Sequence, residues 1–217
     1  MLASSLIDTL RFKRVDPEKF TDFEVSIITQ DTREVKPGAI FIAIVGAVVD
    51  GHQFVDQAVA AGAKMIIAQE PVKTTVPVVY VRDTHRAMAY LADRFYGSPS
   101  QAMKMIGVTG TNGKTTVTHI IEQIFADLGE PTGLMGTMCL KINNQRYPTI
   151  NTTPDVITCQ RMLAKMKSAG VRTATMEVSS IALVEGRVWG IDYNVCVFTN
   201  FTEDHLAFHK TMSQYKL

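Results

Sequence analysis

A ten-residue segment carries residue types that bind phosphate: Gly107-Val108-Thr109-Gly110-Thr111-Asn112-Gly113-Lys114-Thr115-Thr116. It follows a short apolar run and precedes apolar residues at helical spacing, which is the setting of a phosphate-binding loop. Its glycines let consecutive backbone N–H groups point at phosphate oxygens, and the following helix start adds partial positive charge. Lys114 can then bridge the outer phosphates, while the Thr115 hydroxyl can bind a magnesium ion. We therefore predict nucleotide binding by residues 109–116.

This segment departs from the pattern G-x-x-x-x-G-K-[ST] at one position, because Val108 stands where the first glycine is expected. The alternative interpretation is a glycine-rich turn with an incidental lysine. The order of strand, two loop glycines, lysine and paired threonine favours nucleotide binding over that alternative.

Two further residues, Glu177 and His205, are candidates for cation chemistry. A carboxylate and an imidazole can bind magnesium together with water and phosphate oxygens, although magnesium prefers oxygen ligands. Glu177 can instead be a surface acid or pair with Arg172 or Arg187. His205 can instead be an incidental histidine at a helix start, so both alternatives stay open.

Strand and helix signals alternate along the chain. The predicted strands are 39–45, 65–68, 76–81, 105–109, 173–178 and 195–199, and the predicted helices are 54–61, 84–95, 115–128 and 154–168. We expect Thr84 to cap the second helix, and Asn143-Asn144 predicts a hairpin. The alternation predicts an α/β fold with mostly parallel strands. Turn-forming residues gather at 97–100, which predicts a domain over 1–100 and a second over 101–217.

One predicted helix, 115–128, has a clear apolar face. We expect this face to be buried; it consists of Val117, Ile120, Ile121, Ile124 and Phe125.

The composition is that of an ordinary globular protein, with 46% hydrophobic and 20% charged residues and a net charge of +1. This charge gives no general attraction to nucleic acid or membrane. No apolar stretch approaches the roughly 20 residues that span a bilayer, and the N-terminus lacks a signal-peptide pattern. We expect a cytoplasmic monomer, with Cys139, Cys159 and Cys196 as buried free thiols.

The sequence Thr-Gly-Thr-Asn-Gly-Lys-Thr-Thr at 109–116 resembles the ATP loop of the Mur ligases and of the related folylpolyglutamate synthetases. Further segments resemble the Mur ligases in family order: Asp31-Thr32-Arg33, Pro37-Gly38, Phe41-Ile42-Ala43, Gly46, Asp50-Gly51-His52, Asn151-Thr152-Thr153-Pro154-Asp155, Glu177-Val178-Ser179-Ser180 and 199–206. The resemblance covers essentially the whole chain. It implies a small N-terminal α/β domain that binds a UDP precursor, followed by an ATP-binding domain of the phosphate-loop type.

The implied reaction is an ATP-dependent step of peptidoglycan synthesis. The carboxylate of UDP-MurNAc-L-Ala-D-Glu attacks the γ-phosphate of ATP and ADP leaves. The acyl phosphate is then attacked by the amine of a diamino acid, L-lysine or meso-diaminopimelate, which gives the amide and phosphate. By position, the resemblance makes Lys114, Glu177 and His205 catalytic, places ATP on residues 109–116, and gives magnesium to Thr115, Glu177 and His205. It assigns the UDP-MurNAc-dipeptide to Thr32, Asn151, Thr152, Thr153, Ser179 and Arg187, although Arg187 can also pair with Glu185 and Thr32 can cap a turn.

Three departures from the family pattern bear on activity. Thr32 stands in place of serine, Ile181 stands in place of histidine, and a carbamylated lysine expected after Tyr215 would lie beyond Leu217. We therefore expect this chain to bind phosphate or UDP-type ligands weakly and not to ligate by itself. The alternatives are a folylpolyglutamate synthetase-like ligase, a non-catalytic protein that binds the UDP precursor, and a general phosphate-loop switch or kinase.

Overall fold

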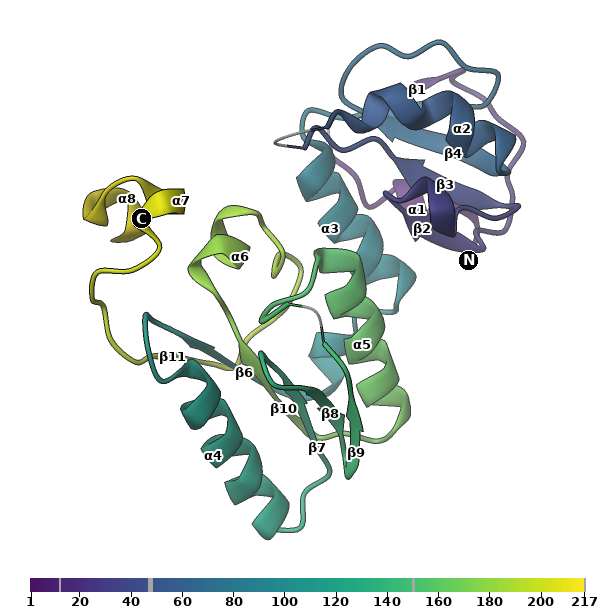
Figure 1. Cartoon of the computed structure of the whole chain (residues 1–217). Coiled ribbons are helices and arrows are strands. Elements are labelled where there is room, and N and C mark those ends of the chain that lie inside the picture. Colours follow the sequence, from purple (N-terminus) through teal and green to yellow (C-terminus); the bar gives the residue numbers. More distant parts are fainter. Residues whose placement is uncertain (12, 47–48, 150, 217) are drawn as a thin grey trace. The chain divides into compact units, whose positions relative to one another are not determined.

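The computed structural model of the chain describes residues 1–11, 13–46, 49–149 and 151–216. Contacts within the chain divide it into two compact units, Met1–Phe95 and Tyr96–Leu217, each with its own sheet (Figure 1). Both sheets are mostly parallel and carry helices, so the predicted fold class is confirmed.

The first unit is built on a five-stranded sheet in the order β1-β5-β4-β3-β2. Its elements are α1 (Ala3–Ile7), β1 (Arg14–Asp16), β2 (Ile27–Thr29), η1 (Thr32–Glu34), β3 (Ala39–Ile42), η2 (Gly51–Phe54), α2 (Val55–Ala60), β4 (Ala63–Ala68), β5 (Val78–Tyr80) and α3 (Thr84–Phe95). Strands β2 to β5 are parallel, and β1 pairs antiparallel with β5. Strand β3 and residues 65–68 of β4 are continuous buried apolar runs, as is typical of parallel sheets covered on both faces.

The second unit is built on a six-stranded sheet in the order β11-β6-β10-β7-β8-β9. Its elements are η3 (Pro99–Ala102), β6 (Lys104–Thr109), α4 (Lys114–Asp127), β7 (Thr132–Met135), β8 (Leu140–Ile142), β9 (Gln145–Tyr147), α5 (Val156–Ser168), β10 (Thr173–Glu177), α6 (Ser180–Val184), β11 (Val195–Phe198), α7 (Leu206–His209) and α8 (Met212–Lys216). Strands β11, β6, β10 and β7 are parallel, whereas β8 and β9 continue the sheet as an antiparallel hairpin.

Chain direction places the two long helices of this unit on opposite faces of its sheet. The chain runs from β6 through α4 to β7. After the β8–β9 hairpin it runs back through α5 to β10, which lies between β6 and β7 in the sheet. Right-handed crossovers in opposite directions put their helices on opposite faces, as Figure 1 shows. The α5 face holds a core of buried side chains that includes Met105, Cys159, Leu163, Met166 and Met176.

The predicted strands, helices and hairpin are present, with ends shifted by a few residues. The predicted burial of α4 is wrong for two of the five apolar residues, whereas Val117, Ile121 and Phe125 are half-buried. Ile120 and Ile124 are each 53% exposed, and the residues that α4 buries are Thr118 and Glu122. The reason is a polar contact: Glu122 accepts hydrogen bonds from Lys141 on β8 and from the Thr132 hydroxyl on β7, which turns this side of the helix toward the sheet.

Two smaller predictions are also corrected. Thr84 does not cap α3, because its hydroxyl and N–H both donate to Gln69, while the Asp83 carboxylate accepts from Arg86 N–H in the first turn. Cys139 and Cys159 are buried free thiols, but Cys196 on the edge strand β11 is exposed.

Candidate active site

The carboxyl ends of the parallel strands in the second unit meet along one edge of its sheet, where α/β proteins form their binding crevices. A cavity of about 420 Å³ opens there. It is lined by Thr111, Asn112, Gly113, Lys114, Thr115, Thr137, Asn151, Thr152, Thr153, Glu177, Ser179, Ile181, Arg187 and His205. Residues from five separate segments therefore face one space.

The phosphate loop connects β6 to α4 through two glycines with positive φ, Gly110 (129°) and Gly113 (86°). A side chain at Gly110 is excluded by space as well, because its Cβ would lie 2.2 Å from the Thr199 hydroxyl oxygen. Lys114 Nζ donates to the carbonyl oxygens of Gly110 and Thr111, at 2.7 and 2.9 Å. Helix α4 has no side-chain cap, so the N–H groups of its first turn are available to an anion.

The two residues that follow β11, Thr199 and Asn200, hold the phosphate loop in place. Thr111 N–H donates to the Asn200 carbonyl oxygen, and Asn112 N–H donates to the Asn200 side-chain oxygen, both at 3.0 Å. The Thr199 hydroxyl and the Asn200 amide both donate to the Asn112 carbonyl oxygen. The sequence pattern that follows β11 thus positions the phosphate loop.

Val108, the departure from the usual loop pattern, lies fully buried inside β6. It pairs with Glu177 on one side and with Val197 on the other. The strand therefore continues through this position, and the loop begins only after Thr109.

Glu177 ends β10 with a fully buried carboxylate. Its Oε2 accepts hydrogen bonds from the hydroxyls of Thr115 (2.8 Å) and Thr137 (3.0 Å), and its Oε1 accepts from Thr137 N–H (2.9 Å). Among the described residues Glu177 forms no ion pair, and Arg187 pairs instead with Glu185. The alternatives of a surface acid or an arginine partner are therefore wrong for Glu177.

The donors around Glu177 fit a magnesium ion. A buried carboxylate without a cationic partner favours a cation beside it, and the Thr115 hydroxyl and Glu177 both offer the oxygen ligands that magnesium prefers. The described parts of the chain contain no group of three or more His, Cys, Asp or Glu side chains that could hold a metal by themselves. Phosphate oxygens and water would have to complete such a site.

Hydrogen bonds of Thr153 attach the Asn151-Thr152-Thr153 segment to the end of β10. The buried Thr153 hydroxyl donates to the Glu177 carbonyl oxygen at 2.8 Å and accepts from Ser179 N–H at 3.0 Å. Arg187 Nη1 donates to the Thr153 carbonyl oxygen at 2.8 Å. These bonds leave Asn151 and Thr152 at the cavity wall.

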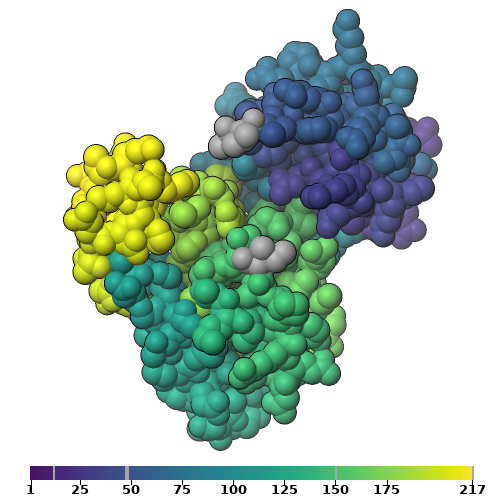
Figure 2. All heavy atoms as spheres, viewed as in Figure 1, coloured from purple at the N-terminus to yellow at the C-terminus, as the bar shows by residue number. Residues whose placement is uncertain are grey.

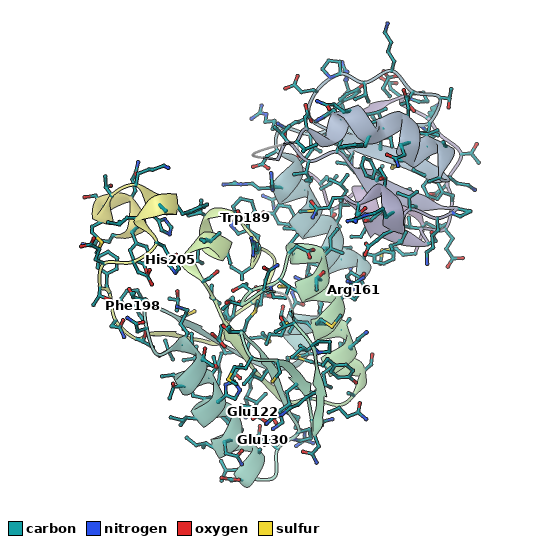
Figure 3. All side chains as sticks on the ribbon, in the orientation of Figure 1. Glu122, Glu130, Arg161, Trp189, Phe198 and His205 are labelled. Atoms are coloured by element: carbon teal, nitrogen blue, oxygen red, sulfur yellow. The ribbon has the colours of Figure 1, made fainter. Side chains whose placement is uncertain are left out.

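The segment around His205 lies against the phosphate loop in Figure 2, where the C-terminal residues are yellow. Thr202 N–H donates to the Thr111 hydroxyl oxygen, which also lies 3.0 Å from the Tyr215 hydroxyl. His205, labelled in Figure 3, has a left-handed backbone conformation (φ 52°). Its Nε2 lies 3.5 Å from Oδ2 of Asp204. These contacts bring His205 to the cavity that also holds Glu177.

The structure thus gathers most of the predicted site residues. Thr109, Gly110 and Thr116 belong to the same loop and helix start but do not line the cavity. Thr32 lies in the first unit on η1, where Asp31 rather than Thr32 caps the turn by accepting from Arg33 N–H. Sequence reasoning missed Thr137 and gave no role to Thr199 or Asn200. No local pattern marks Thr137, whereas the Thr199-Asn200 pair was visible as part of a family motif.

Two family descriptions match the chain. "Mur ligase middle domain" matches residues 108–217, and "Mur ligase family, catalytic domain" matches residues 24–96. The first match covers half of the chain and contains the whole cavity described above. No helix in the described ranges is long and apolar enough to cross a membrane.

Similar proteins carry consistent names. The UDP-N-acetylmuramoyl-L-alanyl-D-glutamate–2,6-diaminopimelate ligase of Lactiplantibacillus plantarum is 65% identical over 99% of this chain, and that of Listeria monocytogenes is 58% identical over 88%. The chain spans 44% and 39% of these relatives.

Solved structures agree in fold. A ligase structure of that same name has a TM-score of 0.78 at 27% identity, with 91% of this chain and 42% of that chain covered. MurF from Acinetobacter baumannii has a TM-score of 0.68 at 21% identity, with 98% and 43% covered, which shows a shared fold. Since the family match spans the cavity-bearing half, the chain belongs to the Mur ligase family.

Proposed function

We propose that this chain provides the ATP- and precursor-binding part of an ATP-dependent ligase that adds 2,6-diaminopimelate to UDP-MurNAc-L-Ala-D-Glu. The observation that supports this most strongly is the single cavity shared by the phosphate loop, Glu177, His205 and the Asn151-Thr152-Thr153 segment. Diaminopimelate rather than lysine is proposed because the compared relatives carry it in their names. The first unit, through Thr32, would bind the UDP end of the precursor.

The proposed reaction has one electrostatic difficulty, because a carboxylate must attack a polyanion. Cations and oriented N–H groups aimed at the transferring phosphoryl group reduce this repulsion in the transition state. Lys114 at the loop and the N–H groups of the first turn of α4 supply such charge on the ATP side. Arg187 at the cavity wall, which also pairs with Glu185, would offer a guanidinium on the side of the precursor.

Magnesium would be held by Thr115 and Glu177, with His205 and Glu177 beside a second ion. A bound magnesium ion supplies charge neutralisation to the phosphate oxygens. The chain's own part is positional: Glu177 is held by three hydrogen bonds, and Thr153 fixes the Asn151-Thr152 segment next to it. The precursor carboxylate would bind between this segment and the γ-phosphate.

Calorimetric titration of the chain tests the proposal. The titrants are a non-hydrolysable ATP analogue with magnesium, and UDP-MurNAc-L-Ala-D-Glu. We expect saturable binding of both, with nucleotide binding lost in Lys114→Ala and precursor binding weakened in Arg187→Ala. The matched control is Lys165→Ala, an exposed lysine on α5 that does not line the cavity.

Each outcome has a definite meaning. Nucleotide binding without precursor binding would contradict the ligase assignment and leave only a phosphate-loop domain. Equal losses in Lys114→Ala and Lys165→Ala would show that nucleotide binding is not located at the loop.

A further inference from the structure

Thr137 is the residue of the cavity wall that neither the sequence motifs nor the proposed function uses. It follows β7 in the short connection to β8, and its neighbour Met138 is 75% exposed. Two of its atoms nevertheless bind the buried carboxylate of Glu177, 40 residues away in the sequence: the N–H to Oε1 at 2.9 Å and the hydroxyl to Oε2 at 3.0 Å. One residue therefore holds both carboxylate oxygens.

The backbone next to Thr137 is shaped around the same carboxylate. A Cβ on Gly136 would lie 2.1 Å from Glu177 Oε1, so only glycine leaves the carboxylate its place. The Thr115 hydroxyl adds a third donor, to Oε2. An ionised carboxylate has about four acceptor positions, so three donors leave about one for a cation. The orientation of that last position depends on the donors that fill the others.

The hydroxyl of Thr137 also lies 3.0 Å from the hydroxyl of Thr152. A threonine hydroxyl has a single proton, and the Glu177 carboxylate is an acceptor only. If Thr137 donates its proton to Glu177, Thr152 must donate to Thr137. The three groups then form one directed chain, from the Asn151-Thr152-Thr153 segment through Thr137 to Glu177.

We propose that Thr137 is a positioning residue that sets the orientation of the Glu177 carboxylate for a divalent cation and couples it to Thr152. This inference rests on the proposed function, because it assumes that Glu177 binds a cation beside the nucleotide. It assigns Thr137 no contact with the nucleotide or the precursor. Thr152 acts on the cation site only through Thr137.

Manganese is the probe, because its binding is measured directly by electron paramagnetic resonance in the presence of a non-hydrolysable ATP analogue. Thr137→Val keeps the branched shape and removes the hydroxyl, whereas Thr137→Ser keeps the hydroxyl. Groups that orient a metal ligand typically contribute 10- to 100-fold to affinity, so we expect Thr137→Val to weaken manganese binding by roughly 10-fold and Thr137→Ser to restore most of it. Met138→Ala is the control in the same connection.

Coupling to Thr152 is tested with the same readout. Thr152→Val should weaken manganese binding in the unchanged chain and have no further effect in the Thr137→Val background. Thr137→Val removes one donor from a buried carboxylate, so we expect its midpoint of thermal unfolding to fall. Nucleotide affinity without metal should stay unchanged, which separates positioning from a general loss of structure.

The outcomes distinguish this inference from the proposed function. Loss of manganese binding in Glu177→Gln with unchanged binding in Thr137→Val would overturn the role of Thr137 alone. Failure of Thr137→Ser to restore binding, or additive effects of Thr137→Val and Thr152→Val, would also overturn it. Absence of manganese binding by the unchanged chain, or full binding by Glu177→Gln, would overturn the cation site and this inference with it.

Discussion

Replacing Lys141 with methionine tests the buried ion pair that joins α4 to the sheet. Lys141 Nζ lies 2.9 Å from Glu122 Oε1, and the two side chains are only 18% and 4% exposed. Methionine keeps most of the apolar stem but leaves the Glu122 charge without a cation. Removing one partner of a buried pair costs about 3–5 kcal/mol. The remaining hydrogen bond from the Thr132 hydroxyl favours the lower end of that range.

Urea unfolding measures the effect. With a denaturant slope of about 1–3 kcal/mol per M, a loss of about 3 kcal/mol lowers the midpoint by roughly 1–3 M. Trp189 is the single tryptophan of the chain and lies in the second unit, so its fluorescence reports on the unit that holds the pair. Adding Glu122→Gln to Lys141→Met removes the unpaired charge and keeps an acceptor for Thr132, so we expect the double variant to recover most of the loss.

A matched surface pair provides the control. Lys104 Nζ lies 3.3 Å from Glu130 Oε1, but Lys104 is 61% exposed, and water screens such pairs. Both glutamates are labelled in Figure 3, Glu122 on α4 and Glu130 just after it. We expect Lys104→Met to leave the midpoint nearly unchanged. A shift for Lys141→Met no larger than that for Lys104→Met, or a double variant no more stable than Lys141→Met, would refute the reasoning from buried charge.

Three other predictions use simpler readouts. Burial raises the pKa of the Cys159 thiol far above its ordinary value, whereas Cys196 is exposed. A thiol reagent at pH 8 should therefore label Cys196 in the folded chain and Cys159 only after unfolding. Rapid labelling of Cys159 in the folded chain, measured by mass spectrometry of peptides, would contradict this. Gly110→Ala should abolish binding of the ATP analogue in calorimetry, because a Cβ there would lie 2.2 Å from the Thr199 hydroxyl oxygen, and wild-type affinity would show that the loop is shaped differently. Leu163→Ala removes a fully buried side chain from the α5 core and should cost about 2–5 kcal/mol in urea unfolding; a loss below about 1 kcal/mol would contradict the described packing.

The phosphate loop and the alternation of strands and helices were predictable because their signals are local. Glycines at 110 and 113, a lysine at 114 and a helix start after an apolar run occupy neighbouring positions in the sequence. The strands β1 and β2 carry no such signal, because each has only three residues. Each also lies at an edge of the sheet and pairs with a single neighbour. Their hydrogen bonds depend on a strand that is distant in the sequence for β1, which pairs with β5, and on β3 for β2.

The contacts that hold Glu177 were not predictable in this way. Thr137 and Glu177 are 40 residues apart, and Asn112 and Asn200 are 88 residues apart, so strand order decides that they meet. The burial of α4 failed for a related reason. The spacing of apolar residues selected the face with Ile120 and Ile124. The helix instead turns the Glu122 side toward the sheet, where Thr132 and Lys141 donate to the buried carboxylate.

The hydrogen bonds between the phosphate loop and Asn200 limit how a phosphate group can bind. The N–H groups of Thr111 and Asn112 already donate to Asn200, so they are not available unless the loop moves. The open donors are the N–H groups at the start of α4, beside Gly113 and Lys114. A phosphate held there lies at the positive end of a 14-residue helix and next to the Thr115 hydroxyl, which donates to Glu177. The proposed anion site and the proposed cation site thus share one helical turn, and for this reason we expect the position of the Glu177 carboxylate to affect how a nucleotide–metal complex binds.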